Sequence, residues 1–150
     1  MNIIVDGPKG VGKTTFIQKL NKKYNDKMNY QHLSYKTDNS FKFHQELLND
    51  KDKIIDRFAF SEIVYSIIYH RKCKISISQL RQLIEKSKDN DFIIMYSRNF
   101  NLLKQRIEKR DNTKLSSQDL EILYLSNEMF KILGQLLCSE YDNVHIYAVS

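Results

Sequence analysis

The feature that most constrains this chain is a glycine-rich segment between a predicted strand and a predicted helix. Residues 7–14 read GPKGVGKT, which matches the pattern G-x-x-x-x-G-K-[ST]. A predicted buried strand at residues 2–6, with an apolar centre at 3–5, precedes the segment, and a helical pattern from residue 14 to about 24 follows it. Glycines let the backbone approach an anion closely, so that amide groups and the positive end of the helix surround it. The segment therefore predicts a phosphate-binding loop.

Glycine usage supports this interpretation. The chain has 4 glycines and 1 proline, and three of the glycines lie with the proline between residues 7 and 12. Lys13 would reach the β- and γ-phosphates of a nucleotide, and the Thr14 hydroxyl would bind Mg²⁺. We expect ATP to contact the whole segment, which consists of Gly7, Pro8, Lys9, Gly10, Val11, Gly12, Lys13, Thr14 and Thr15.

Apolar runs alternate with helical patterns along the rest of the chain. Ser78, Asn99 and Ser116 are the expected helix N-caps. Strands that are nearly all apolar and alternate with helices predict a parallel sheet covered on both faces, an α/β fold of three layers. We expect further strands within 30–36 and at 54–56, 91–96 and 144–147, and further helices at 41–48, 58–70, 78–88, 100–110 and 116–137.

Length and composition favour one soluble domain. The 150 residues are 41% hydrophobic and 28% charged, and the chain has no repeat or linker. We expect no membrane span, no signal peptide and a cytoplasmic location. The net charge of +6 suits nucleic acid and a polyanionic small ligand equally, and the chain has no separate basic tail. The partner that we expect is a small nucleotide or nucleoside rather than nucleic acid. Cys73 and Cys138 form no CxxC pair, so we expect two reduced, buried thiols. The four histidines, His32 among them, lack metal-ligand spacing and are expected to be structural or surface residues.

A group of polar residues follows the third predicted strand, where residues 56–58 read DRF. Ligands of parallel α/β sheets bind at the carboxyl ends of the strands, so Asp56 and Arg57 should emerge beside the loop. An acid there can hold Mg²⁺ or its waters, and an arginine can bind phosphate bidentately. Arg57, Ser61, Tyr65 and Tyr69 share one helix face, which predicts a wall of an acceptor pocket. Core packing is the alternative for the two tyrosines.

Two arginines lie one helical turn apart after the fourth predicted strand. Arg106 and Arg110 would repel each other by a few tenths of a kcal/mol at this spacing, so a bound anion would explain their placement. A solvated basic face with Lys104 and Lys109 is the alternative.

The loop, the segment DRFAFSEIVY at residues 56–65 and these arginines resemble the thymidylate kinase and deoxynucleoside kinase branch of P-loop kinases, especially small thymidylate kinase-like enzymes of bacteriophages. The resemblance covers nearly the whole chain. It implies a five-stranded parallel sheet and one kinase domain over residues 1–150, with a short lid around 106–118. It implies that Asp56 and Arg57 serve Mg²⁺ and the acceptor, and that Arg106 and Arg110 close over the transferring phosphate. Family members commonly form dimers through helices beside the acceptor site, so a homodimer is compatible with the resemblance.

Other positions bear on the acceptor. Lys9 stands where thymidylate kinases often carry an acid that meets the sugar. Asp38 would act as a base toward a nucleoside, whereas Lys36 would bind the phosphate of a nucleotide. Phe41 would stack on a base or belong to the core. Glu62 belongs to the acceptor segment of the resemblance.

The sequence thus predicts a nucleoside monophosphate kinase that uses ATP and Mg²⁺, with a deoxynucleotide such as dTMP as acceptor. Two alternatives stay open at this point. One is a deoxynucleoside kinase that phosphorylates a 5′-hydroxyl. The other is a non-catalytic protein that binds nucleotides or nucleic acid.

Overall fold

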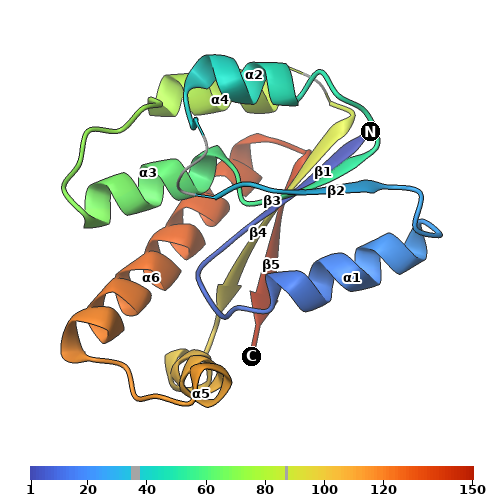
Figure 1. The fold of residues 1–150 in the computed structure, drawn as a ribbon. Helices are drawn as coiled ribbons and strands as arrows, with labels where there is room; N and C mark the ends of the chain where they lie inside the picture. Colours follow the sequence, from blue (N-terminus) through green and yellow to red (C-terminus); the bar gives the residue numbers. More distant parts are fainter. Residues whose placement is uncertain (35–37, 87) are drawn as a thin grey trace.

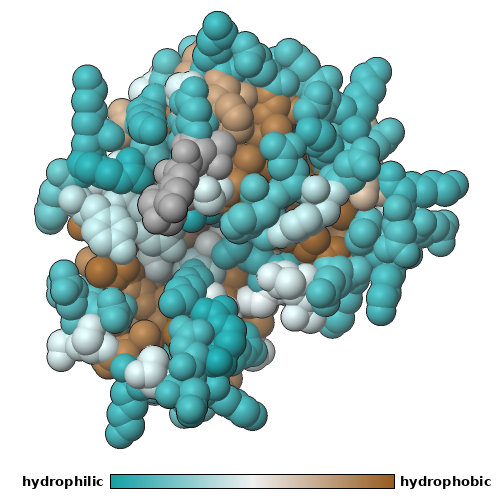
Figure 2. All heavy atoms as spheres, viewed as in Figure 1, coloured by the Kyte–Doolittle hydropathy of each residue, from teal (hydrophilic) through white to brown (hydrophobic). Residues whose placement is uncertain are grey.

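The computed structural model describes residues 1–34, 38–86 and 88–150 as a five-stranded sheet with helices on both faces (Figure 1). Hydrophilic side chains cover most of the face seen in Figure 2. The strands are β1 (Asn2–Asp6), β2 (Asn29–His32), β3 (Lys53–Asp56), β4 (Asn90–Ser97) and β5 (Val144–Val149). The helices are α1 (Lys13–Lys23), α2 (Phe41–Leu47), α3 (Ala59–Ile68), α4 (Ile77–Glu85), α5 (Phe100–Asp111) and α6 (Ser117–Glu140).

The sheet has the order β2-β3-β1-β4-β5, and every neighbouring pair is parallel. This confirms the predicted α/β fold with a five-stranded parallel sheet. The central strand β1 is buried along its whole length, with Val5 opposite Asp56 of β3 and Asp6 opposite Ile94 of β4. The carboxyl ends of β1 and β3 therefore lie side by side, which brings the glycine-rich loop next to Asp56 and Arg57.

Two apolar clusters lie on opposite faces of the sheet, because alternate residues of a strand point to opposite sides. Ile4 and Ile55 face the cluster formed with α2, α3, α4 and α6. Ile3 and Ile54 face the second cluster, to which α1 and α5 contribute. Each face of the buried strands is therefore covered, as expected for a parallel sheet.

The edge strand β2 differs from the prediction that all strands are nearly apolar. Three of its four residues are exposed, and Tyr30 keeps 53% of its surface in solvent. An edge strand has one neighbour, and its side chains are not enclosed between helices. Polar residues are therefore tolerated there, and His32 and Tyr30 are free to reach toward the end of β3.

The helices α4, α5 and α6 each begin where a side chain accepts a hydrogen bond from a backbone N–H of the first turn. Asn99 accepts a hydrogen bond from Leu102 N and Ser116 accepts one from Asp119 N, which confirms both predicted caps. The prediction of Ser78 as the cap of α4 is wrong, because Ser76 caps this helix. Ser76 has Gln79 three residues later, and the pair forms a reciprocal capping box.

Both cysteines are free thiols, Cys73 half-buried and Cys138 exposed. The expectation of two buried thiols is therefore wrong for Cys138, which lies on an outward face of α6. Among the described residues, no helix combines the length and apolar character that a membrane crossing requires.

Candidate active site

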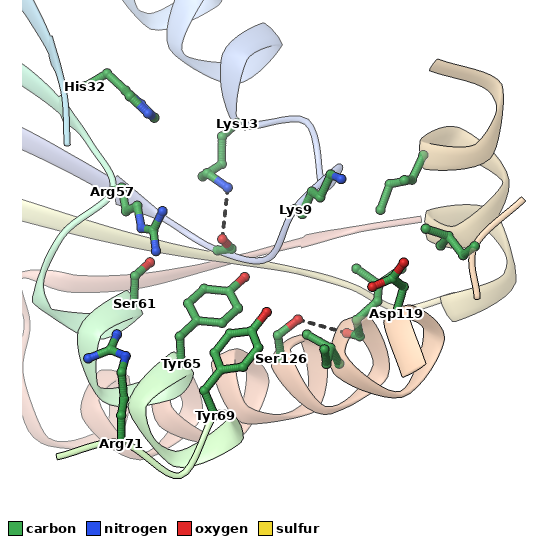
Figure 3. Close-up of a pocket in the computed structure, with 15 residues that line it drawn as sticks. Lys9, Lys13, His32, Arg57, Ser61, Tyr65, Tyr69, Arg71, Asp119 and Ser126 are labelled. Atoms are coloured by element: carbon green, nitrogen blue, oxygen red, sulfur yellow. Dashed lines mark hydrogen bonds between the residues drawn. The ribbon is translucent and has the colours of Figure 1, made fainter. Parts of the chain in front are cut away.

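The side chain of Lys13, at the start of α1, folds back over the backbone of the loop between β1 and α1. Lys13 Nζ donates a hydrogen bond to the carbonyl oxygen of Gly7 at 2.9 Å (Figure 3). It donates a second one to the carbonyl oxygen of Pro8 at 3.1 Å. Burial lowers the pKa of Lys13, and the charges of Asp6 and Asp56 oppose this shift. Gly12 has φ 99°, a left-handed backbone that suits glycine. The lysine is thus already turned toward the space that the loop encloses.

The loop also packs tightly against α5. Gly10 has φ 76°, and a Cβ atom added there would overlap the Ile107 side chain. A glycine is therefore required by both backbone and space. The contact links the phosphate-binding loop directly to the segment expected to form the lid.

Asp6, at the carboxyl end of β1, joins the loop to the start of α3. Its side chain is fully buried, and its Oδ1 accepts hydrogen bonds from Gly7 N (2.9 Å) and Ser61 Oγ (2.5 Å). Oδ2 accepts from Phe58 N (3.0 Å) and Ser61 N (2.9 Å). Burial raises the pKa of Asp6, opposed by the Ser61 hydrogen bond and by the charges of Lys13 and Arg57. The carboxylate therefore acts as a rigid connector beside the two cations.

Asp56 ends β3 with one carboxylate oxygen hydrogen-bonded and the other buried, and it is not among the residues that line the cavity described below. Oδ2 accepts a hydrogen bond from the Tyr30 hydroxyl (2.7 Å) and lies 3.2 Å from His32 Nδ1. Oδ1 is buried and has no hydrogen-bond partner among the described residues. An orphaned carboxylate oxygen beside a phosphate-binding loop fits a cation or its bound water.

Arg57 adopts a left-handed backbone with φ 75°, and its N–H donates to Val5 O at 2.8 Å. Its guanidinium lies 5.4 Å from the centre of the Tyr65 ring. A left-handed conformation in a residue with a Cβ costs about 1–2 kcal/mol. Such strain is typical of residues that a site holds in place.

One cavity of about 740 Å³ connects the loop with α3 and α6 (Figure 3). The four residues predicted to form one wall, Arg57, Ser61, Tyr65 and Tyr69, all line it. The tyrosine rings stack with centroids 6.2 Å apart and an angle of 26°. The other lining residues are Gly7, Lys9, Lys13, His32, Arg71, Ile107, Leu115, Asp119, Ile122, Leu123 and Ser126.

The two predicted lid arginines lie on the exposed side of α5, outside the cavity lining. Arg106 Nη2 donates to Ser150 O (3.0 Å), and Arg110 Nε donates to Asp111 Oδ1 (3.0 Å). The other oxygen of Asp111 lies 3.4 Å from Lys9 Nζ. Asp111 therefore connects the phosphate-binding loop with the end of α5.

The remaining predicted residues are spread over several environments. Thr14 and Thr15 are exposed at the start of α1. Phe41 packs against the core, and Asp38 is exposed and accepts a hydrogen bond from Ser40 N that lowers the pKa of its carboxyl. Lys36 lies outside the described residues.

Glu62 does not line the cavity. It is buried, and its carboxylate forms an ion pair with Arg71 at 2.7 Å. Arg71 itself does line the cavity, together with His32, Asp119 and Ser126. Sequence reasoning missed these four residues as well as Asp6. A charged residue directly after the apolar centre of a predicted strand and directly before the loop was the available signal for Asp6.

Comparisons with known proteins agree with this fold. The family model of the AAA domain matches residues 1–131. No curated protein matches the chain. The Bacillus subtilis YorR protein, solved in complex with phosphorylated GDP, has 21% identity and a TM-score of 0.76, covering 99% of this chain and 84% of that one.

Two structures of kinases share the fold at lower identity. Polyphosphate kinase 2 from Arthrobacter aurescens TC1 has 12% identity and a TM-score of 0.61, and the match covers 99% of this chain but 60% of that one. Deoxyadenosine kinase from M. mycoides, solved with dCMP and a flexible dCDP, has 17% identity and a TM-score of 0.51, covering 100% and 90%. At these identities the likeness is one of fold.

Proposed function

The chain belongs to the AAA domain family, and on that premise we propose that it is a kinase that transfers the γ-phosphate of ATP to a deoxynucleotide, with dTMP as the leading acceptor. The observation that carries this proposal is the single cavity that joins Lys13 of the phosphate-binding loop to the wall of Arg57, Ser61, Tyr65 and Tyr69. A donor on the loop and an acceptor on the wall would share this space.

The charges of the cavity support a phosphorylated acceptor. Lys9, Lys13, Arg57 and Arg71 line it, while Asp119 is the acidic residue among the described lining residues. Transfer between two phosphates needs alignment and neutralisation of charge more than a strong base. Asp38, the candidate base for a nucleoside acceptor, does not line the cavity. These observations favour the nucleotide over the nucleoside.

ATP would place its β- and γ-phosphates in the loop. Lys13 would exchange its two carbonyl partners for phosphate oxygens. A hydrogen bond from an ammonium group to a charged phosphate is stronger than one to a neutral carbonyl. Thr14 and the free Oδ1 of Asp56 would hold Mg²⁺, directly or through water. Mg²⁺, when bound, neutralises charge on the β- and γ-phosphates.

The lid arginines would complete the site by moving. Arg106 and Arg110 are exposed, but Ile107 and Leu115 of the same segment already line the cavity. A small closing movement of this segment would bring the guanidinium groups toward the phosphates and exclude water. Arg57 would neutralise the transferring group from the opposite side.

An acceptor screen tests this function. The purified protein is given ATP and Mg²⁺ with each of the four deoxynucleoside monophosphates and their nucleosides, and ADP release is followed. We expect turnover with monophosphates, and a loss of at least about 100-fold in Lys13→Ala. Lys19→Ala, an exposed lysine on the same helix, is the matched control and should keep full activity.

Three outcomes would count against the proposal. Turnover with nucleosides alone would identify a deoxynucleoside kinase. Tight ATP binding without turnover on any acceptor would favour a non-catalytic nucleotide-binding protein, and DNA binding that Arg106→Ala and Arg110→Ala weaken would favour a nucleic-acid-binding one.

A further inference from the structure

Arg71 reaches the cavity by folding back along α3. The chain reverses after the helix at His70, which has φ 53°, and Arg71 N donates to Ser66 O at 3.0 Å. The side chain then extends to Glu62 in the first turn of the helix. Arg71 Nη1 and Nη2 donate to the two carboxylate oxygens of Glu62 at 2.7 and 3.1 Å. The guanidinium is therefore fixed near the end of α3 that adjoins the phosphate-binding loop.

Glu62 is a buried anchor for this arginine. Its side chain is 3% exposed, whereas that of Arg71 is 39% exposed. A backbone N–H of Lys74 also donates to Glu62, at 3.2 Å, so the carboxylate is held from both sides. An isolated pair on the surface contributes little, but a bidentate pair with one buried partner fixes the direction of the guanidinium.

The pairing leaves donors of Arg71 for a ligand. A guanidinium carries five N–H groups, and Glu62 takes two of them. The remaining donors belong to a side chain that lines the cavity. Figure 3 shows this guanidinium on the same flank of the cavity as Ser61 and Arg57.

We propose that Arg71 and Arg57 together bind the phosphate of the acceptor, and that Glu62 is the positioning residue that holds Arg71 for this contact. The inference rests on the proposed function. Two guanidinium groups on one flank, with Lys13 at the adjoining loop, attract a doubly charged phosphate more strongly than a neutral sugar or base. Glu62 thus acts on the acceptor through Arg71 and does not touch it.

Binding measurements without turnover test this inference. Calorimetry measures the affinities for dTMP, thymidine and ATP, each added separately, in the wild-type protein and its variants. Arg71→Ala should weaken dTMP binding by about 10- to 100-fold and leave thymidine and ATP binding unchanged. Arg71→Lys keeps the positive charge but not the planar guanidinium that donates two parallel hydrogen bonds. It should therefore weaken dTMP binding less than Arg71→Ala does.

A second variant separates positioning from folding, because Arg71→Ala leaves Glu62 buried without its partner. The double variant Glu62→Gln with Arg71→Gln keeps a neutral hydrogen-bonded pair and should show the same selective loss of dTMP affinity. Glu62→Gln alone keeps Arg71 and should weaken dTMP binding by a smaller factor than the double variant does. Arg81→Ala is the matched control, because Arg81 forms a similar bidentate pair with Glu140 on the surface away from the cavity.

Specific outcomes would overturn the inference. An equal loss of dTMP and thymidine would assign Arg71 to the base or sugar, and unchanged dTMP binding in correctly folded variants would leave the ion pair a purely structural role. Because these are binding data, a phosphate-selective loss can be seen even if the acceptor screen finds no kinase activity. Conversely, turnover on monophosphates with Arg71 variants unaffected would reject this inference alone.

Discussion

On the α3 side of the cavity, the carboxylates of Asp6 and Glu62 are buried and hydrogen-bonded through both oxygens, whereas on the α5 side the arginines are exposed and held by single contacts. Asp6 accepts four hydrogen bonds and Glu62 accepts three. Within the described residues, Arg106 and Arg110 each make one side-chain hydrogen bond, to Ser150 and to Asp111. The α3 side is therefore built before any ligand arrives, while the α5 side can exchange its partners at little cost. Changes to the first should affect stability, and changes to the second should affect turnover.

The strongest test of this contrast is Asp6→Ala. The change leaves the N–H groups of Gly7, Phe58 and Ser61 and the Ser61 hydroxyl without their acceptor. We expect the free energy of unfolding to fall by about 3–5 kcal/mol. Arg106→Ala should change it by less than about 0.5 kcal/mol. Urea denaturation of both variants measures the difference, and similar losses in the two would break the contrast.

A pH-dependent test concerns His44 of α2, which packs beneath the α3 side. Its ring is fully buried, 4.6 Å from that of Phe58, and its nitrogens have no hydrogen-bond partner among the described residues. Burial lowers the pKa of His44 from 6.5 to about 4, although the charges of Glu62 and Asp38 oppose the shift.

Between these pH values the unfolded chain binds a proton at His44 that the folded chain does not. The folded state should therefore lose about 3 kcal/mol from this group as the pH falls from 6.5 to 4. His44→Phe should flatten that part of the curve of unfolding free energy against pH. If the variant kept the wild-type slope, His44 would not be the group responsible.

The α5 side is tested by the double variant Arg106→Ala with Arg110→Ala. We expect kcat for the proposed transfer to fall by about 100-fold, because two positive groups are lost from the transition state. The free energy of unfolding should stay within about 0.5 kcal/mol of the wild type. Lys104→Ala with Lys109→Ala removes the same charge from the same helix and is the control. A comparable loss of kcat in that control would indicate a general effect of charge.

The smallest effect is expected for Asp111→Asn. This carboxylate pairs with Lys9 and Arg110, and both contacts are largely exposed. Its loss should change stability by less than about 1 kcal/mol. It should also raise the affinity for ATP about twofold in low salt, because the negative charge of Asp111 no longer offsets the positive charges of Lys9 and Arg110. Salt screens such exposed charges, so this gain in affinity should vanish in high salt. An improvement that persists in high salt would point to a conformational cause.

Local patterns predicted the frame of the molecule well. The loop from Gly7 to Thr14, the helix after it and the parallel order of the buried strands depend on short-range rules of spacing and apolar content. Part of the wall was also predictable, because helical spacing places Ser61 and Tyr65 on one face of α3. Arg57 precedes this helix in a left-handed conformation and Tyr69 follows its last residue, so helical spacing alone does not place these two residues in the wall.

The missed residues depend on contacts that no local pattern records. Arg71 follows the end of α3 and enters the cavity because the chain turns back and Glu62 pairs with it. His32 reaches the site from an edge strand whose exposure was not foreseen. Asp119 and Ser126 line the cavity because α6 packs against α3, and this packing follows from the tertiary fold rather than from the composition of the helix.

Because of the left-handed backbone of Arg57, selection for thermal stability and selection for activity should favour different residues at this position. Glycine at this position would relieve the strain, so a search for heat-resistant variants that ignores activity should tend to replace the arginine. A search that demands phosphate transfer should restore it. The residue thus offers a way to read, from the survivors of directed evolution, which property the experiment has rewarded.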